Sequence, residues 1–205
     1  MLTLVSILNE NKHLGKTFVS VDIQPEYEKA FGFGIEDYCS FLNELESDKL
    51  VFLYNGYDTL DMIRKEDYRY WFLENGLSEE VLDTARFYDK GYAFFRYCMD
   101  NSLEDETVAN FVRFMYNNDV RDSRDMTRDM WAKYLREYRL RDRKVVYELL
   151  RDSGDCVHIP DLMDYVKQLN NIVLTGGGVN ECLKEVEIAL MALNKPYQVE
   201  HKFTY

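Results

Sequence analysis

The sequence of 205 residues lacks any apolar run near the roughly 20 residues that a membrane-spanning helix needs. Residues 1–8 are apolar but lack a basic leader and are too short for a convincing signal peptide. Positive charge is also scarce, because 25 Lys and Arg stand against 37 Asp and Glu, a net charge of −12. Non-specific binding to nucleic acid or to an anionic membrane needs a basic face, so we expect neither partner.

Cysteine is sparse as well. Cys39, Cys98, Cys156 and Cys182 lie far apart and form neither a C-x-x-C pair nor a small disulfide framework. We therefore expect reduced thiols in a cytoplasmic protein. Aromatic residues are plentiful, with 16 Tyr and 12 Phe, so we expect an ordered chain. The length suits a single domain over residues 1–205.

Short apolar, β-branched runs alternate with helix-type patterns along the chain. We expect strands at 16–22, 49–54, 85–89 and 172–174 and an edge strand at 197–205. Helix-type spacing occupies 34–47, 61–75, 161–169 and the stretch after Cys182. This alternation predicts an α/β fold with a doubly wound, mainly parallel sheet flanked by helices. We expect five or six strands in the order 3-2-1-4-5.

Residues 101–154 break this alternation and predict an α-helical insertion within the domain. The charged run at 121–129 is expected to be a solvated helical face, stabilised by pairs three or four residues apart. The alternative is a subunit contact or a lid. A homo-oligomer formed through the insertion is therefore possible.

The stretch Asn171–Leu183 (NIVLTGGGVNECL) predicts a strand, a sharp glycine turn and a helix. Cys182 falls at or just before the first helical turn. Backbone N–H groups at a helix start have no intrahelical partner, and the helix dipole is positive there. A thiol in that place ionises more readily, and the same N–H groups could hold an oxyanion. The plainer interpretation is a small buried cysteine after an ordinary turn.

Four chemically useful side chains follow predicted strands: Asp22, Asp58, Lys90 and Cys182. Ligands bind beyond the carboxyl ends of the strands in sheets of this class. A carboxylate can take the thiol proton, and an ammonium favours both the carboxylate and the thiolate. Acid, amine and thiol together thus form a nucleophile set. Asp and Lys are common at strand ends, so a chance meeting stays open.

Three motifs resemble those of the isochorismatase-like cysteine hydrolases, which include nicotinamidases and related amidohydrolases. Asp22–Tyr27 (DIQPEY) is similar to the family's D-x-Q-x-[DE]-[FY] element. Lys90–Phe94 (KGYAF) resembles its lysine motif, and Gly176–Leu183 (GGGVNECL) resembles its G-x-x-[TS]-x-x-C-V element. The motifs occur in the family's order, and the resemblance covers residues 16–100 and 160–205.

The resemblance implies that Cys182 is the nucleophile, Asp22 the general base and Lys90 their electrostatic partner. It also implies a cis peptide bond at Gly177–Gly178 and an oxyanion hole made by the N–H groups of Gly178 and Cys182. The implied reaction is attack on the carbonyl of a small amide-like substrate, a thioester intermediate and release by water.

The sequence departs from the family in three respects, and one is the helical block 101–154, which lies between the lysine and the glycine turn where the family's connection is short. Val179 stands where the family has Thr or Ser. Metal-binding nicotinamidases carry an Asp-x-His arrangement and a further His after strand two, whereas this segment has only Asp58 and Asp61. We therefore expect no metal and no other cofactor. The chain's three histidines lie elsewhere, at His13, His158 and His201.

Several side chains near the motifs are candidates for the wall of a substrate pocket, although aromatic residues near strand ends more often belong to the core. The candidates are Gln24, Tyr27, Tyr57, Tyr92, Phe94 and Phe95.

Two other functions stay open. In a non-catalytic descendant the fold is kept and the acidic insertion binds a protein partner, which Val179 and the insertion favour. In a Mg²⁺-dependent phosphohydrolase or nuclease, Asp22, Asp58 and Asp89 would be the oxygen ligands. That function leaves Cys182 and the three glycines without a role.

Overall fold

The computed structural model describes residues 15–45, 49–54, 56, 64–90, 104–138, 157, 159 and 161–205. These residues form two compact units. The first unit contains the described residues up to Lys90 together with 169–183 and 197–205. The second contains the described residues from 104 to 168 together with 184–196.

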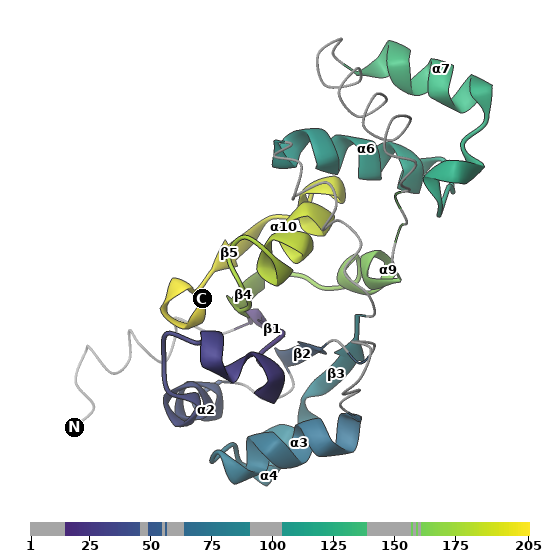
Figure 1. Ribbon diagram of the computed structural model, residues 1–205. Coiled ribbons are helices and arrows are strands. Elements are labelled where there is room, and N and C mark those ends of the chain that lie inside the picture. Colours follow the sequence, from purple (N-terminus) through teal and green to yellow (C-terminus); the bar gives the residue numbers. More distant parts are fainter. Residues whose placement is uncertain are drawn as a thin grey trace. The chain divides into compact units, whose positions relative to one another are not determined.

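The first unit is built on a five-stranded sheet in which every strand pair is parallel (Figure 1). Its strands are β1 (Thr17–Val21), β2 (Leu50–Tyr54), β3 (Arg86–Asp89), β4 (Ile172–Gly176) and β5 (Tyr197–Val199). The order β3-β2-β1-β4-β5 confirms the predicted α/β fold and strand order. The chain runs from β1 outward to β3 and then returns to the other side of β1 for β4. The strand order therefore reverses between β1 and β4.

The central strands are continuous apolar runs because both of their faces are covered. Every residue of β2 and β4 is buried, and in β1 only Thr17 is partly exposed. One face packs on an aromatic core supplied by α2 (Ile35–Asn43), α3 (Lys65–Glu74) and α4 (Glu79–Thr84). In this core Phe52 of β2 lies 4.8 Å, centroid to centroid, from Phe72 of α3. A 3₁₀ helix, η1 (Pro25–Ala30), links β1 to α2.

The edge strand is shorter than predicted. Instead of pairing over 197–205, β5 ends at Val199, and a 3₁₀ helix, η4 (His201–Phe203), follows. The last ladder contact is the Glu200 N–H, which donates to the Leu174 carbonyl at 2.9 Å. Turning there buries Phe203, which lies 5.1 Å from the ring of Tyr38. Burial of this ring replaces further strand pairing.

The second unit is helical in its described residues. It contains α6 (Asp105–Asn117), η3 (Ser123–Asp125), α7 (Arg128–Glu137), α9 (Leu162–Val166) and most of α10 (Cys182–Ala192). The buried side chains of α6 follow helical spacing, and Tyr134 of α7 packs between Phe111 and Phe114 at centroid distances of 5.1 and 5.2 Å. Both α6 and α7 fall in the segment 101–154 that was expected to be a helical insertion.

The charged run 121–129 is not one continuous helical face, and that expectation is wrong, because only Arg128 and Asp129 of the run belong to an α-helix, α7. Asp119 adopts a left-handed backbone with φ 56° and ends α6 before the run begins. The run instead pairs its backbone with Val157 and Ile159, at N···O distances of 2.7 Å. The Thr127 hydroxyl then accepts from a first-turn N–H of α7 and starts that helix. The helix boundaries in this segment are therefore set by Asp119 and Thr127 and not by the spacing of the charged residues.

In the part of the chain that the structure describes, no helix has both the length and the apolar character needed to span a bilayer.

Candidate active site at the carboxyl edge of the sheet

The three predicted catalytic residues belong to one edge of the sheet. Asp22 follows β1, Lys90 follows β3, and Cys182 begins α10 after the turn that leaves β4. All three lie in the first unit. Parallel sheets bind their ligands at this edge, where the strand order reverses. Here the reversal falls between β1 and β4, next to Asp22 and the glycine turn.

Strand β2 aligns the backbones of Asp22 and Lys90. The Asp22 N–H donates to the Leu53 carbonyl and the Lys90 N–H donates to the Tyr54 carbonyl, both at 2.9 Å. Consecutive residues of a strand direct their carbonyls to opposite neighbours. The end of β2 therefore has the Asp22 backbone on one side and the Lys90 backbone on the other, at almost the same position along the strand. These two residues are 68 positions apart in the sequence.

The two side chains form a buried ion pair. Lys90 Nζ lies 2.9 Å from Asp22 Oδ2, and the side chains are 0% and 1% exposed. Despite this short distance, neither carboxylate oxygen accepts a hydrogen bond of ordinary geometry from a described residue. Burying a charge away from water raises the free energy of the folded state unless an opposite charge lies beside it. Removing either Asp22 or Lys90 would therefore leave the other as an uncompensated buried charge. The carboxylate keeps lone pairs that are free to take a proton or a further donor.

Three residues around the site have positive φ. Asp22 has φ 43°, and Gly176 and Gly177 have 77° and 75°. Aspartate tolerates this region better than most residues with a Cβ, but such backbone is strained, and such strain clusters at functional sites. The chain therefore turns sharply both at Asp22, directly after β1, and at Gly176 and Gly177, at the end of β4.

Packing also requires two of the glycines. A Cβ on Gly176 would lie 2.6 Å from Ile23, and one on Gly177 would lie 3.1 Å from the Leu183 nitrogen and 3.3 Å from Val21. Gly177 is thus wedged between the end of β1 and the start of α10. The peptide bonds of the described residues are all trans, so the expected cis bond at Gly177–Gly178 is wrong. Two successive positive φ angles make the turn instead.

Cys182 is the first residue of α10, as the sequence predicted, and it is partly exposed. The turn before it is held by the Gly178 carbonyl, which accepts from the N–H groups of Glu181 and Leu183 at 3.0 and 3.1 Å. None of the hydrogen bonds that hold this turn among the described residues uses the Gly178 N–H. That group is a candidate oxyanion donor.

The second described cysteine has the opposite setting. Cys39 is buried in the aromatic core, and burial raises the pKa of its thiol to about 12. Such a thiol is inert at neutral pH. Cys98 and Cys156 lie outside the described residues. Cys182 is therefore the more accessible of the two described thiols.

Sequence reasoning missed Tyr205, which was assigned only to an edge strand. Its N–H donates to the Gly177 carbonyl at 3.1 Å, and its carbonyl accepts from the Val179 N–H at 2.7 Å. Its hydroxyl donates to the Asp22 carbonyl at 3.3 Å. One residue therefore contacts both the turn after β1 and the turn after β4. No motif in the sequence marks this role.

The pKa of Tyr205 reports on the same neighbourhood. Burial raises this pKa well above its usual range, and the charges of Cys182 and Asp22 raise it further. The hydrogen-bond geometry agrees with this, since the Tyr205 backbone pairs with the turn that precedes Cys182 and the Tyr205 hydroxyl donates to the Asp22 carbonyl.

A second missed residue is Tyr68 of α3. It is fully buried, and its hydroxyl has no hydrogen-bond partner among the described residues. Burial raises its pKa well above the usual value, with smaller contributions from Tyr38 and Asp22. The Tyr68 hydroxyl therefore stays protonated at neutral pH.

The predicted pocket residues have mixed outcomes. Gln24 is buried, and its side-chain amide donates to Glu26 at 3.3 Å. Tyr27 is partly buried. Val179 is 41% exposed. The other candidates lie outside the described residues: Tyr57, Tyr92, Phe94 and Phe95.

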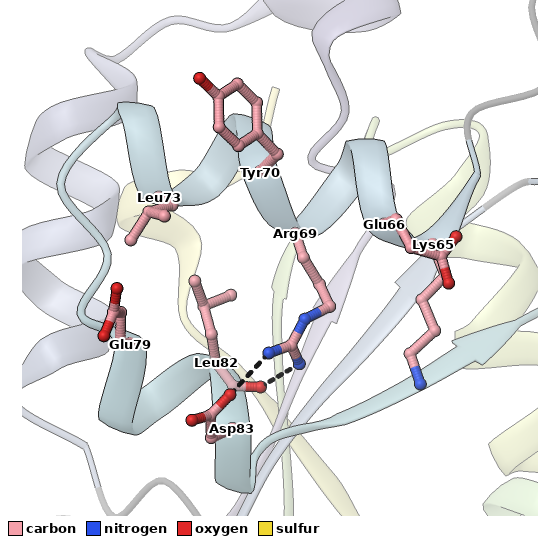
Figure 2. A pocket seen from close by; sticks show the side chains of 8 residues that line it. All are labelled: Lys65, Glu66, Arg69, Tyr70, Leu73, Glu79, Leu82 and Asp83. Carbon is pink, nitrogen blue, oxygen red and sulfur yellow. Dashed lines mark hydrogen bonds and ion pairs between the residues drawn. The ribbon is translucent and has the colours of Figure 1, made fainter.

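A separate hollow of about 520 Å³ lies between α3 and α4 and includes none of the predicted site residues (Figure 2). Arg69 spans it, donating to the Leu82 carbonyl and, at 2.8 Å, to the Asp83 carboxylate. Its guanidinium also lies 5.2 Å from the Phe87 ring centroid. The Arg69 guanidinium therefore joins α3 to α4 through hydrogen bonds within the protein.

Among the residues that the structure describes, no group of three or more His, Cys, Asp or Glu side chains is arranged to hold a metal ion. Of the three aspartates considered as Mg²⁺ ligands, Asp22 faces Lys90, and Asp89 accepts from the Gly56 N–H at 3.1 Å. Asp58 lies outside the described residues.

No protein-family model matches this chain, and neither a curated protein nor a solved structure matches it.

Proposed function

We propose that this protein is a metal-independent cysteine hydrolase that cleaves an amide-like C–N bond of a small molecule. The observation that carries the proposal is the buried Asp22–Lys90 ion pair, 2.9 Å long, at the sheet edge where the partly exposed Cys182 begins a helix. Thiol, carboxylate and ammonium are the groups that a cysteine nucleophile needs. The resemblance of the three motifs to isochorismatase-like hydrolases supports the same chemistry.

The first step uses Asp22 as general base. Its carboxylate takes the proton of the Cys182 thiol, and the thiolate attacks the substrate carbonyl carbon to form a C–S bond. Lys90 stays protonated beside the carboxylate and favours the negative charge that is passed between oxygen and sulfur. The start of α10 adds its positive dipole at the same sulfur.

The tetrahedral intermediate carries its charge on the former carbonyl oxygen. The N–H groups of Gly178 and Cys182 are the proposed donors to this oxyanion. The C–N bond then breaks, the amine leaves with the proton held by Asp22, and a thioester remains on Cys182. Water attacks the thioester, Asp22 takes the water's proton, and the acid and the free thiol are released.

We further propose a cytoplasmic setting, since widely spaced cysteines suit a reducing compartment. Association of copies through the segment 101–154 stays a prediction.

The experiment is mass spectrometry of wild type and Cys182→Ala after incubation with a panel of small amides. We expect an acyl adduct on Cys182 in wild type and none in the variant, with product release only from wild type. Cys39→Ala is the matched control, because Cys39 is a buried thiol of the aromatic core, and this variant should form the adduct as wild type does.

A second candidate is a non-catalytic binding protein with the same fold. The observation in its favour is Val179, which stands where the family has a hydroxyl residue and is 41% exposed. Alkylation with iodoacetamide at neutral pH separates the two functions. A Cys182 that reacts no faster than glutathione, a free thiol of ordinary pKa, would point to the binding protein, whereas faster alkylation of Cys182 than of glutathione supports the hydrolase.

A further inference from the structure

Tyr205 connects two parts of the candidate site, the turn after β4 and the turn after β1. Its backbone pairs with the turn after β4, through Gly177 and Val179, at 3.1 and 2.7 Å. Its side chain reaches the turn after β1, where the hydroxyl donates to the Asp22 carbonyl at 3.3 Å. The carboxylate and the thiol flank these two turns.

The Tyr205 ring is held in this position by its neighbours. Its centroid lies 5.0 Å from that of Phe31, which itself stacks on Phe33 at 5.2 Å with an angle of 6° between the rings. A Cβ placed on Gly178 would lie 3.7 Å from the Tyr205 ring. The ring therefore fills the space between the aromatic side chains after η1 and the glycine turn.

The hydroxyl of Tyr205 acts as a donor and not as a base. Burial raises its pKa well above the ordinary tyrosine value, and the nearby charges of Cys182 and Asp22 raise it further. The phenol therefore stays neutral throughout the pH range in which a cysteine hydrolase works. It fixes the turn at Asp22 without adding a negative charge that would oppose the thiolate.

We propose that Tyr205 is a positioning residue of the Cys182 site, which ties the turn after β4 to the turn after β1. It thereby sets the place of the thiol relative to Asp22 and Lys90. This inference rests on the proposed function, because only a reacting thiol depends on such placement. Tyr205 touches no reacting atom in this role and acts through the two turns.

The test measures the rate at which iodoacetamide alkylates Cys182, followed by mass spectrometry of the peptide that contains it. Each protein is measured at neutral pH, where the rate depends on stabilisation of the thiolate. Each is also measured at alkaline pH, where an exposed thiol is ionised whatever its neighbours. The variants are Tyr205→Phe, which keeps the ring, and Tyr205→Ala, which removes it.

The matched control is Tyr116→Phe. It removes a partly buried hydroxyl that donates to Asp164 at 2.7 Å in the second unit. Cys39 serves as an internal reference in every sample, because a buried thiol is alkylated only when the core opens.

We expect Tyr205→Phe to slow neutral alkylation of Cys182 about threefold to tenfold, the effect of one lost hydrogen bond. Tyr205→Ala should slow it further, up to about thirtyfold, which is the ratio at pH 7 between a fully ionised thiol and a free thiol of ordinary pKa. Both variants should keep the wild-type rate at alkaline pH, and Tyr116→Phe should keep it at both. A purely structural role would instead change the alkaline rate, or leave both rates unchanged, and either result overturns the inference.

Failure of this inference is distinguishable from failure of the proposed function. If wild-type Cys182 reacts no faster than glutathione at neutral pH, the hydrolase itself is wrong. If wild-type Cys182 is fast and both Tyr205 variants match it, only the positioning role is wrong. Should Tyr205→Ala unfold, as alkylation of Cys39 would reveal, Tyr205→Phe decides alone, because it retains the contact with Phe31.

Discussion

Two ion pairs in this protein have nearly the same length and opposite surroundings. At the sheet edge, Lys90 Nζ lies 2.9 Å from Asp22 Oδ2 with both side chains out of contact with water. In the second unit, Arg121 Nη2 lies 2.7 Å from Asp164 Oδ2 with side chains 45% and 47% exposed. Water solvates and screens the second pair but neither solvates nor screens the first.

The comparison shows that the N···O distance of an ion pair does not determine its contribution to stability or to chemistry. The exposed pair is part of a surface network, since Asp164 also accepts from the Tyr116 hydroxyl at 2.7 Å. Water can replace any member of such a network at little cost. Water cannot replace either member of the buried pair, and the Asp22 carboxylate has lone pairs without a hydrogen-bond donor among the described residues. A carboxylate with such lone pairs can accept a proton from a neighbouring group.

The largest expected effect comes from removing one member of the buried pair. Lys90→Met should lower the free energy of unfolding by about 3 to 5 kcal/mol, because it leaves the Asp22 carboxylate buried and uncompensated. Arg121→Met makes the same change in the exposed pair and should cost less than about 1 kcal/mol. Urea denaturation followed by circular dichroism measures both.

A second variant identifies the cause. Asp22→Asn combined with Lys90→Met removes both charges and keeps a residue type that tolerates the positive φ of position 22. It should recover part of the stability lost by Lys90→Met alone, while alkylation of Cys182 stays slow. Equal losses for Lys90→Met and Arg121→Met would show that burial does not separate the two pairs.

The next effect tests the strained turn beside the buried pair. Gly177→Ala should lower the free energy of unfolding by about 1 to 3 kcal/mol, because alanine resists a φ of 75° and its Cβ would lie 3.1 Å from the Leu183 nitrogen. Gly178→Ala is the matched control and should cost less than about 1 kcal/mol, since its Cβ meets nothing closer than 3.5 Å. Thermal melting compares the variants, and equal losses would contradict the geometry of the turn.

The fold could be predicted from sequence because its signals are local. Each buried strand is a short apolar run of the sequence. Helix-type spacing between two such runs indicates a helical crossover, which connects parallel strands. The prediction was wrong where single polar residues control the backbone. Asp119 and Thr127 end and begin helices around the charged run, so the pattern of charges there did not decide its structure. The edge strand was overextended because burial of Phe203 depends on tertiary contacts.

The site was partly predictable for a related reason. Asp22, Lys90 and Cys182 each follow a strand, so the topology alone brings them to one edge. Tyr205 could not be found this way, because its contacts with Asp22 join residues 183 positions apart and no spacing rule predicts them. The turn before Cys182 was predicted as a glycine turn, but its positive φ angles with trans bonds emerge only from packing against Val21 and Leu183.

A smaller effect compares two aspartates with positive φ. Asp119 follows α6 with φ 56°, and the next N–H, of Val120, donates to the Met115 carbonyl at 3.0 Å, the pattern of a helix end that favours glycine. Asp119→Gly should therefore raise the free energy of unfolding by about 1 kcal/mol. Asp22→Gly relieves the same kind of strain but leaves Lys90 unpaired and should destabilise. Urea denaturation distinguishes them, and a gain in stability at both positions would contradict the role given to the buried pair.

The smallest effect concerns the exposed pair and its dependence on pH. The Tyr116 hydroxyl, followed by Arg121, holds the pKa of Asp164 below its ordinary value of 3.8. A lowered pKa in the folded state contributes stability that is present above the ordinary value and is lost as pH falls through the folded value. Asp164→Asn should therefore cost about 0.5 kcal/mol at neutral pH and low salt, and nothing in acid below the folded pKa. Urea midpoints across this pH range, repeated at high salt, measure the change. A difference from wild type that persists unchanged in acid and in high salt would mean that Asp164 acts through packing and not through charge, and the contrast with the buried pair would weaken.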